Sequence, residues 1–275
     1  MHKYDYHTHN SFSMDSNTAI EGMIEAAIDA GFSEIAITDH CDFTWPDIEI
    51  LQTHPRLTRP YSFCFEQYCG YVQKMQHRYH DKITVLLGCE MGIRHDVGEA
   101  IQKITDAHSF DFVLGSMHDF EGLDFSYREF FKTRTKFEAY SEYFELMAAA
   151  VDACDFDVLG HMDYIERYAP YSDPTLKYAD YAEYIDNVLR KVIAKNRGIE
   201  LNTGSFNYGM TRPHPSLEIL SRYKELGGKI ITFGSDAHSP KRLGAHFDEA
   251  VELAKQAGFR YFAAFSQRKA RMLPL

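Results

Sequence analysis

Histidines and acidic residues that could bind metal ions recur at the ends of short apolar segments of this sequence. The chain begins DYHTHN, with His7 and His9, and near its far end the segment IITFGSDAH closes on Asp236 and His238. Four further segments end in TDH, GCE, GSMH and GHMD, which contribute Asp39, His40, Glu90, His118, His161 and Asp163. Metal sites are built from imidazoles and carboxylates that converge from separate places in the sequence. The repeated pattern therefore predicts one shared metal site.

Taken one at a time, these motifs also have purely structural explanations. Asp39 or His40 could cap the helix that follows, and His118 or His161 could be a hydrogen-bonded histidine of the core. Glu90 is harder to explain in this way, because it directly follows the apolar segment TVLLGC and a carboxylate is costly to bury without a cation. Structural explanations for all of the motifs together would require many coincidences. We therefore expect a metal site, with Glu90 as a carboxylate that bridges two metals.

The elements that must position these residues alternate between strand and helix. Continuous apolar runs, typical of strands buried on both faces, predict strands at 3–7, 34–38, 83–88, 111–115, 157–160, 199–202 and 229–234, with a short last strand at 260–265. Helices are expected at 18–30, 97–107, 137–152, 178–196, 216–226 and 246–257. The first of these helices should begin with a capping box of Thr18 and Glu21 and end at Gly31.

This alternation predicts an α/β fold with a parallel sheet, which could be open or closed into a barrel. Chemically active residues end at least five different strands, and in a barrel all strand C-termini point to one mouth. An open sheet binds its ligand at a switch point that fewer strands serve. We therefore favour a barrel of about seven strands, whose closure should be imperfect. A single domain over residues 1–275 is the simplest organisation.

Two insertions interrupt the alternation. Residues 42–61 are rich in proline and aromatic residues and include Trp45, Arg56 and Arg59, and residues 119–136 carry several cations. Both insertions follow strands that end in candidate ligands, so both should overhang the mouth of the barrel. Long loops at such a place usually act as lids or as specificity elements.

The composition limits the classes of function. The chain has 275 residues, of which 45% are hydrophobic and 25% charged, as expected for a globular protein with a substantial core. Its formal net charge is -11, from 29 basic and 40 acidic residues. This charge argues against a nucleic-acid or membrane partner. A small anionic substrate needs only a few local cations and remains compatible with it.

The cysteines and the N-terminus indicate a cytoplasmic protein. Five cysteines form no CxxC motif and no regular framework, which favours reduced thiols over a disulfide scaffold. The first residues, MHKYDYHTHN, lack the apolar region of a signal peptide. No apolar run approaches the roughly 18 residues of a membrane span. The sequence leaves the oligomeric state open.

The candidate ligands belong to a series of motifs. Along the chain these are, in order, HxH, TDH, a strand-end Glu, GSxH, GHxD and GSDAH. In this order and context the sequence resembles the polymerase-and-histidinol-phosphatase superfamily of metal-dependent phosphoesterases, from His7 to about Leu243. The segments GHMDYIERY and ELNTGS are most similar to the stand-alone histidinol-phosphate phosphatases. The resemblance implies a distorted (β/α)7 TIM-like barrel with its active site at the C-terminal ends of the strands. It also implies two to three divalent metal ions, and mixed nitrogen and oxygen ligands suit Zn, Mn or Fe.

Residue by residue, the resemblance implies three ligand sets. The first set is His7, His9, Glu90 and Asp236, the second shares Glu90 and adds His118 and His161, and the third is Asp15, His40 and His238. A metal-bound hydroxide linked to Glu90 would attack the phosphorus of a small phosphomonoester. The third metal, or Asp15 and His40 if that site is empty, would assist the leaving alkoxide. The implied substrate is L-histidinol phosphate, which would give L-histidinol and phosphate. The implied catalytic residues are Asp15, His40, Glu90 and Asp236.

A phosphate dianion also needs protein cations. Arg167 in DYIERY follows the His161 strand end and is the first candidate, and Arg212 and Arg242, in loops after later strands, come next. Acidic residues near the mouth, supplied by the insertions, could receive the amine of an amino-alcohol phosphate. The segment SFNYGMTRPHP and the two insertions depart from the pattern of the family, and they concern the substrate more than the chemistry.

Three alternatives remain at this point. A metal-dependent hydrolase of C–N bonds would also use HxH, and it usually needs a carboxylated lysine or a bridging acid on a central strand. Here the central strand ends in Glu90, and no lysine closes a comparable apolar run, so a phosphatase is favoured. A phosphoesterase of nucleotides or phosphodiesters, with a DNA polymerase as partner, is disfavoured by the acidic charge. A non-catalytic zinc module is disfavoured because structural zinc sites are closed and four-coordinate. We therefore expect a hydrolase of phosphoric monoesters.

Overall fold

Parallel strands form the centre of the molecule. The structure, a computed structural model, describes residues 3–43 and 63–275. Its strands pair in the order β1-β2-β4-β5-β8-β9-β10, with β3 beside β4, and every pairing in this sheet is parallel. The strands are β1 (Lys3–Asp5), β2 (Phe32–Ile37), β3 (His40–Cys41), β4 (Thr84–Gly92), β5 (Phe112–Ser116), β8 (Val158–Leu159), β9 (Gly198–Asn202) and β10 (Ile231–Gly234).

The two ends of this sheet meet in the segments that follow β1 and β10. The Tyr6 N–H donates to the Phe233 carbonyl at 2.9 Å, and the His9 N–H donates to the Ala237 carbonyl at 2.9 Å. Thr8 and Ala237 form an isolated parallel bridge between them. A few bonds therefore close the sheet into a distorted seven-stranded barrel, which confirms the predicted fold.

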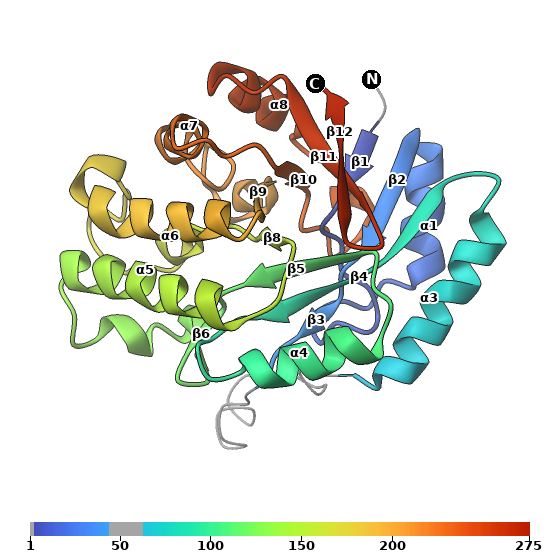
Figure 1. Ribbon diagram of the computed structural model, residues 1–275, viewed down its shortest axis with the longest axis horizontal. Coiled ribbons are helices and arrows are strands. Elements are labelled where there is room, and N and C mark those ends of the chain that lie inside the picture. Colours follow the sequence, from blue (N-terminus) through green and yellow to red (C-terminus); the bar gives the residue numbers. More distant parts are fainter. Residues whose placement is uncertain (1–2, 44–62) are drawn as a thin grey trace.

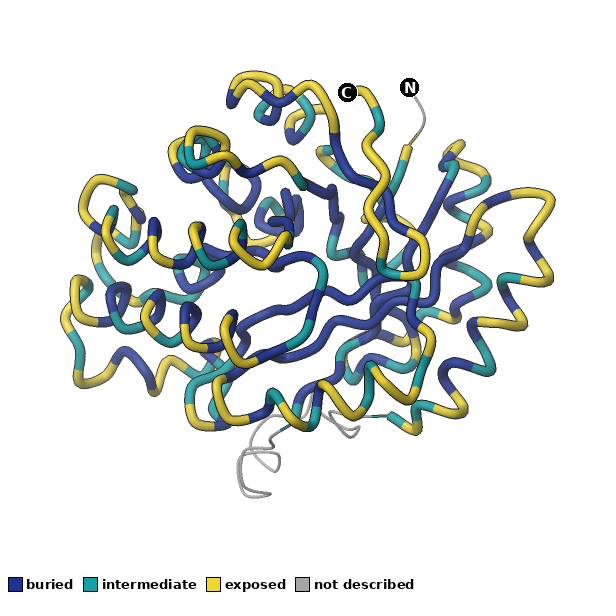
Figure 2. Tube along the Cα trace, viewed as in Figure 1, coloured by how far each residue is buried: buried dark blue, intermediate teal, exposed yellow. Residues whose placement is uncertain are grey.

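Helices cover the outside of the barrel (Figure 1). They are α1 (Ile20–Asp29), α3 (Phe65–Tyr79), α4 (Gly98–Ala107), α5 (Lys136–Ala153), α6 (Ala182–Ala194), α7 (Leu217–Glu225) and α8 (Phe247–Gln256). The strands between them are almost entirely buried, whereas the helices alternate between buried and exposed residues (Figure 2). None of the described helices is long and apolar enough to cross a membrane.

Two details of the helices differ from the expectation. The sequence prediction omitted α3, whose buried stripe consists mainly of tyrosine, cysteine and methionine rather than of aliphatic residues. The capping box predicted at Thr18 is wrong, because α1 begins at Ile20 and no side chain caps it. The Thr18 hydroxyl instead donates to the His238 carbonyl at 2.9 Å, which ties the start of α1 to the end of the barrel seam.

The last predicted strand lies outside the barrel sheet. β11 (Tyr261–Ser266) pairs antiparallel with β12 (Lys269–Pro274), and this hairpin lies in front of the other strands in the view of Figure 1. The Phe265 ring packs 6.0 Å from the Tyr6 ring and 5.1 Å from the Phe112 ring, between centroids. The Phe265 N–H donates to the Tyr6 hydroxyl at 2.6 Å, and the Arg271 guanidinium donates to Glu34 near the start of β2 at 2.7 Å. The hairpin therefore plugs the end of the barrel where the strands begin.

The second insertion folds into a small packed unit. It contains the antiparallel pair β6 (Asp119–Phe120) and β7 (Leu123–Asp124) and two short 3₁₀ helices, Phe125–Tyr127 and Glu129–Phe131. Phe125, Phe130 and Phe131 are buried, and the Phe125 N–H donates to the His118 carbonyl at 3.1 Å. Of the first insertion, only Asp42 and Phe43 belong to the described residues, so the predicted lid with Trp45, Arg56 and Arg59 lies outside them.

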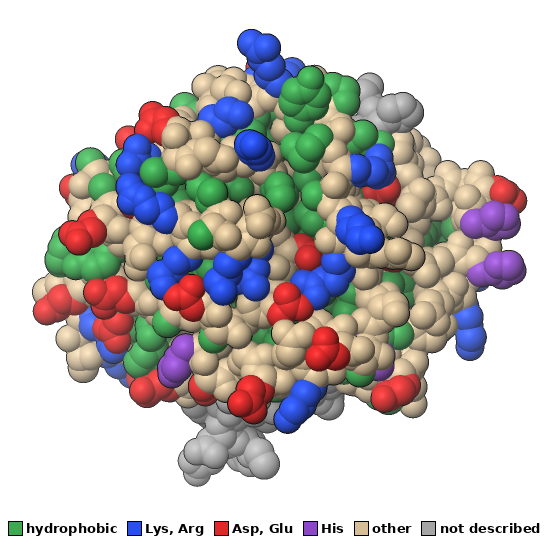
Figure 3. All heavy atoms as spheres, viewed as in Figure 1, with side chains coloured by type: hydrophobic (Ala, Val, Ile, Leu, Met, Phe, Trp, Pro, Cys, Tyr) green, Lys and Arg blue, Asp and Glu red, His purple; other side chains and the backbone are tan. Residues whose placement is uncertain are grey.

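The surface and the thiols agree with a globular chain. Acidic and basic side chains are interspersed over the face seen in Figure 3. All five cysteines are free thiols, and Cys64 is the exposed one among them.

Phe265→Ala is expected to lower the free energy of unfolding by about 3–5 kcal/mol, because removing a buried phenyl ring leaves a cavity at the base of the barrel. Urea unfolding followed by circular dichroism would measure the change. Tyr261→Ala is the matched control, because Tyr261 lies on the same hairpin with 53% of its surface exposed, whereas Phe265 is 3% exposed. Its effect should stay within about 0.5 kcal/mol. Equal, small effects of both substitutions would contradict the role of the hairpin as a plug.

Candidate metal centre

The ends of the strands bring imidazoles and carboxylates together at one mouth of the barrel. His7 and His9 follow β1, Glu90 lies within β4, and Asp236 and His238 follow β10. The remaining predicted ligands come from the loop before α1, from β3 and from the ends of β5 and β8: they are Asp15, His40, His118 and His161. Each of these nine side chains lies within 4 Å of at least one other member of the cluster.

Glu90 lies at the centre of this cluster and is fully buried. Its Oε1 atom lies 3.1–3.2 Å from the Nε2 atoms of three histidines, His7, His118 and His161. Its Oε2 atom lies 2.8 Å from His40 Nδ1 and 3.4 Å from His9 Nε2. One carboxylate therefore contacts five imidazoles from different parts of the barrel.

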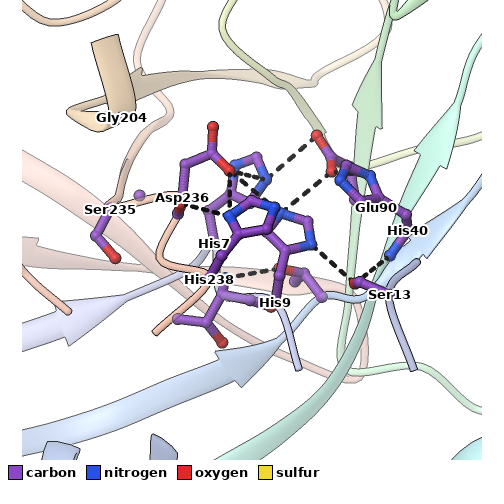
Figure 4. A network of polar contacts seen from close by, with 12 residues as sticks. His7, His9, Ser13, His40, Glu90, Gly204, Ser235, Asp236 and His238 are labelled. Atoms are coloured by element: carbon purple, nitrogen blue, oxygen red, sulfur yellow. Dashed lines mark hydrogen bonds and ion pairs between the residues drawn. The ribbon is translucent and has the colours of Figure 1, made fainter. Parts of the chain in front are cut away.

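Asp236 is a second carboxylate of the cluster and lies on the side of the histidine rings opposite to Glu90. Figure 4 shows His7, His9 and His238 crowded between Asp236 and the pair of Glu90 and His40. Asp236 Oδ1 lies 3.3 Å from His9 Nε2 and 3.7 Å from His7 Nε2. Its backbone has a φ of 54°, a left-handed conformation that is uncommon for residues other than glycine and recurs at functional sites. The Asp236 N–H donates to the His7 carbonyl at 2.9 Å, so this conformation belongs to the seam of the barrel.

Asp15 completes the outer edge of the cluster. Its Oδ2 atom lies 2.8 Å from His238 Nε2 and 3.6 Å from His40 Nε2. The Asp15 side chain is 41% exposed, in contrast to Glu90. The cluster therefore runs from a dry centre at Glu90 to a wet edge at Asp15.

Outer contacts orient the histidine rings. His7 Nδ1 lies 2.6 Å from Glu200 Oε1, His9 Nδ1 lies 3.1 Å from the Ser13 hydroxyl, and His118 Nδ1 lies 3.2 Å from Asp42 Oδ1. A ligand histidine usually donates its second ring N–H to such a partner, which fixes its tautomer and orientation. The first ring nitrogen is then left to face the cluster.

Glu200 is a site residue that the sequence analysis missed. It is 1% exposed, and its Oε2 atom accepts the His161 N–H at 3.0 Å and the Asn202 amide at 3.1 Å. Gly234 makes room for it, because a Cβ at that position would lie 2.0 Å from Glu200 Oε1. The available signal was a glutamate between the apolar residues Ile199 and Leu201 of a predicted strand.

The residues present fit divalent metal ions. Four buried ligand atoms have no hydrogen-bond partner among the described residues: His7 Nε2, His9 Nε2, His40 Nδ1 and Glu90 Oε2. Such atoms destabilise a fold by about 1–3 kcal/mol each when nothing satisfies them. Four groups of three ligand atoms lie within 4.8 Å of one another: His9, His40 and His238; His7, Glu90 and His161; His7, His9 and Asp236; and His40, Glu90 and His118. The groups share residues, and they cut across the three ligand sets that the resemblance implied.

The charges of the cluster suit ligation. Burial raises the pKa of Glu90, but His7, His118 and His40 lower it by more, so that its pKa lies well below its usual range. Burial, together with neighbouring His40 and His238, lowers the pKa of His9 to about 3. Burial lowers the pKa values of His7, His40, His118 and His238, but the neighbouring carboxylates raise them by more. Because an ionised carboxylate and a neutral imidazole are the forms that bind metals, metal ions would take the place of the protons on these four rings.

A cavity of about 170 Å³ opens beside the cluster. Six of the nine cluster residues line it: Asp15, His40, His118, His161, Asp236 and His238. Asp124, Ser126 and Tyr127 of the second insertion also line it, so that this insertion lies at the mouth as expected. Arg167 lines the cavity from the segment that follows β8.

Arg167 is buried but keeps two donors available. Its side chain is 3% exposed, and its guanidinium lies 4.7 Å from the Tyr164 ring centroid and 4.2 Å from that of Tyr208. The Nη2 atom lies 3.9 Å from Asp236 Oδ2. Neither Nε nor Nη2 has a hydrogen-bond partner within the described part of the chain. Two aromatic rings thus hold a cation whose N–H groups can receive an anion beside the cluster.

The other two candidate arginines are not brought to this cavity. Arg212 donates to Asp163 at 2.8 Å and pairs with Glu166, and Arg242 is exposed in the 3₁₀ helix Pro240–Arg242. Neither is among the residues that line the cavity. The phosphate-binding role predicted for them receives no support from this geometry.

Two acids of the strand-end motifs hold loops and are not among the grouped ligand atoms. Asp163 accepts from Arg212 and from the Ser216 N–H at 3.1 Å, and it lies 2.5 Å from His214 Nδ1. Asp39 accepts from the Asn10 N–H at 2.6 Å and from the Ser13 hydroxyl at 2.6 Å. The strand-end position alone did not separate these acids from the candidate ligands.

The comparisons with known proteins agree with this geometry. The PHP domain matches residues 5–204 of the chain. The chain belongs to the PHP family. A histidinol-phosphatase of Lactococcus lactis is 34% identical over 274 residues, which cover 98% of this chain and 96% of the relative. A protein of Clostridium acetobutylicum named "Probable histidinol-phosphatase" is 34% identical over 261 residues, with 94% of each chain covered.

A solved structure extends the likeness of this PHP chain to three dimensions. The histidinol phosphate phosphatase from Lactococcus lactis, in complex with zinc, L-histidinol and phosphate, superimposes with a TM-score of 0.84 at 32% identity. The match covers 98% of both chains. The whole barrel, including the hairpin that follows the matched PHP domain, therefore has a counterpart in that protein.

Glu200→Gln should weaken the binding of divalent metal by about 10–100-fold, because the neutral amide no longer supports the His7 ring as a carboxylate does. Competition against a chromophoric chelator would measure the affinity. Glu183→Gln on the exposed side of α6 is the control and should leave the affinity unchanged. If Glu200→Gln lowered thermal stability while binding metal normally, Glu200 would be a core acid rather than a residue that orients a ligand.

Proposed function

We propose that this chain is a metal-dependent phosphomonoesterase that hydrolyses L-histidinol phosphate to L-histidinol and phosphate. The proposal rests on two features that line the same cavity: the imidazole–carboxylate cluster, and the buried Arg167, whose Nε and Nη2 donors have no partner among the described residues. Metals and a guanidinium are the groups that bind a phosphate dianion. The likeness over nearly the full length to a histidinol-phosphatase supplies the identity of the substrate.

The residues of the cluster would hold two to three divalent ions. His7, His9 and Asp236 form one group of ligands, Glu90 joins it to His118 and His161, and His40 and His238 form the outer group beside Asp15. Zinc is the first choice because the related Lactococcus lactis structure contains it. Manganese or iron also suits mixed nitrogen and oxygen donors. When bound, such ions neutralise the phosphoryl oxygens and lower the pKa of a coordinated water.

The protein's own residues position the substrate. Arg167 receives two phosphoryl oxygens through Nε and Nη2, while Tyr164 and Tyr208 hold its plane in place. Because Arg167 is already buried and ordered, little rotamer entropy is lost when it binds. Its neighbour Asp236 keeps the guanidinium charged and oriented toward the cluster.

The wet edge of the cluster faces the leaving group. Asp15 and His40 both line the cavity, and they lie 3.6 Å apart between Oδ2 and Nε2. A metal ion held by the outer group would stabilise the departing alkoxide, and in its absence the Asp15 carboxyl or the His40 imidazolium could supply the proton that this oxygen needs. Glu90, being dry and ionised, keeps the inner histidines in place through the same step.

The hydrolase of C–N bonds gains no support. The described residues that line the cavity include no lysine that could be carboxylated. Membership of the PHP family also favours phosphoester chemistry over that alternative.

A panel of substrates tests the proposal directly. The value of kcat/KM should be highest for L-histidinol phosphate, lower for other amino-alcohol phosphates and sugar phosphates, and lowest for nucleotides and single-stranded DNA, since the acidic chain repels polyanions. Protein stripped with a chelator should lose activity and regain it with zinc or manganese. A preference of tenfold or more for a nucleotide or a DNA end, about 1.4 kcal/mol in barrier, would reject the histidinol-phosphatase function.

Arg167→Ala is expected to lower kcat/KM for phosphomonoesters by at least about 100-fold, because two charge-assisted hydrogen bonds of about 1.5–3 kcal/mol each are lost. Steady-state kinetics, together with elemental analysis, would show this loss at unchanged metal content. Arg167→Lys should restore only part of the activity, because lysine lacks the planar fork. Arg190→Ala, at a mostly exposed position of α6, is the control. Normal kinetics of Arg167→Ala would contradict the phosphate-binding role of Arg167.

A further inference from the structure

The cavity carries opposite charges at different places. Arg167 is its one guanidinium or ammonium group among the described residues, and four carboxylates also line it: Asp15, Asp42, Asp124 and Asp236. A phosphate group bound by Arg167 and the cluster explains the positive charge in the cavity. The role of each carboxylate depends on whether a group of opposite charge within the protein already pairs with it.

Three of the four carboxylates have cationic or imidazole partners. Asp15 lies 2.8 Å from His238 Nε2, Asp42 lies 3.2 Å from His118 Nδ1, and Asp236 faces His9 and Arg167. Asp124 differs from all three. Asp124 accepts hydrogen bonds from Ser126, including one from its N–H at 2.7 Å, and no Lys, Arg or His of the described chain lies within ion-pair distance of it.

The surroundings of Asp124 make this isolation costly. Burial raises the pKa of its carboxyl, and the Ser126 hydrogen bonds and the charge of His118 only partly offset that effect. Asp124 is partly buried at the wall of the cavity, and a substrate that fills the cavity would remove water from its carboxylate. A cationic group on that substrate would then compensate the charge. Arg167 shows the complementary condition in the same cavity, since it is a buried cation with donors that lack partners.

We propose that Asp124 receives the positively charged group of the substrate, an ammonium or imidazolium group, while Arg167 and the cluster hold its phosphate. This inference rests on the proposed phosphatase function for the phosphate end, and it names the substrate class as cationic phosphomonoesters. The insertion that carries Asp124 also brings the Tyr127 side chain to the cavity, and Tyr164 lines it from the other side. Aromatic faces beside a carboxylate favour a flat or cationic group.

A purely structural role for Asp124 predicts something different. Asp124 precedes the 3₁₀ helix Phe125–Tyr127, and its side chain accepts from the Ser126 N–H as a cap. Capping needs an acceptor but no charge, so asparagine or serine can fulfil it. Asp124→Asn and Asp124→Ser therefore keep the cap and remove the charge.

The experiment compares substrates that differ in one charge. We expect wild-type protein to hydrolyse 2-aminoethyl phosphate with a higher kcat/KM than the neutral-tailed propyl phosphate. Asp124→Asn and Asp124→Ser should lower kcat/KM for 2-aminoethyl phosphate and L-histidinol phosphate by about 10–100-fold, since a desolvated charge pair is lost, and should change propyl phosphate by less than about threefold. Asp173→Asn is the matched control, because Asp173 accepts the Thr175 N–H at 3.0 Å in an exposed turn away from the cavity.

A second measurement reads the subsite without turnover. Calorimetric titration with L-histidinol in the presence of inorganic phosphate should show binding to wild-type protein and binding at least about tenfold weaker to Asp124→Asn, with unchanged melting temperatures. Equal losses for charged and neutral esters, or no loss for either, would overturn the role of Asp124. If wild-type protein failed to hydrolyse L-histidinol phosphate but still preferred the aminoethyl ester through Asp124, the histidinol-phosphatase function would fail while this inference stood. Failure of wild-type protein to discriminate the two esters or to bind L-histidinol would reject the inference itself.

Discussion

One buried carboxylate, Glu90, organises the mouth of this barrel. Five imidazoles from four separate segments of the fold lie within 3.4 Å of its two oxygens. A charge without access to water must be neutralised by groups that reach it at close range. Because those groups come from the ends of β1, β5 and β8 and from β3, the position of Glu90 in β4 is fixed by the closure of the whole barrel. The cluster and the fold therefore depend on each other.

The seam of the barrel makes this dependence visible. The segment with His7 and His9 and the segment with Asp236 and His238 are also the two segments that close the sheet, through the His7 carbonyl and the Ala237 carbonyl. A separation of the seam would move four candidate ligands at once. The hairpin β11–β12 supports the seam from the other end, since its Phe265 packs on Tyr6, directly before His7. Stability and chemistry thus share the same backbone bonds.

The sequence was sufficient for the cluster because parallel strands deliver their C-terminal residues to one place, whatever the details of packing. All nine predicted ligands meet there. The sequence was not sufficient to predict which side chains pair with one another in the folded protein. Glu200 lies in β9 opposite Thr232 of β10, and Arg212 is paired with Asp163 and Glu166, although both Arg212 and Arg167 lie in loops that follow a strand. The hairpin was missed as a plug because a short apolar strand gives no sign of its partner.

Chemistry and selectivity come from different parts of the chain. The strands and their ends supply the cluster, and rigid elements hold it through Glu200, Ser13 and Asp42. The insertion between β5 and α5 supplies Asp124, Ser126 and Tyr127, on loops that pack on the core through buried phenylalanines. Loops tolerate change far better than barrel strands do. A barrel of this kind can therefore keep its phosphate chemistry while a change in one inserted loop alters the charge that it accepts at the other end of the substrate.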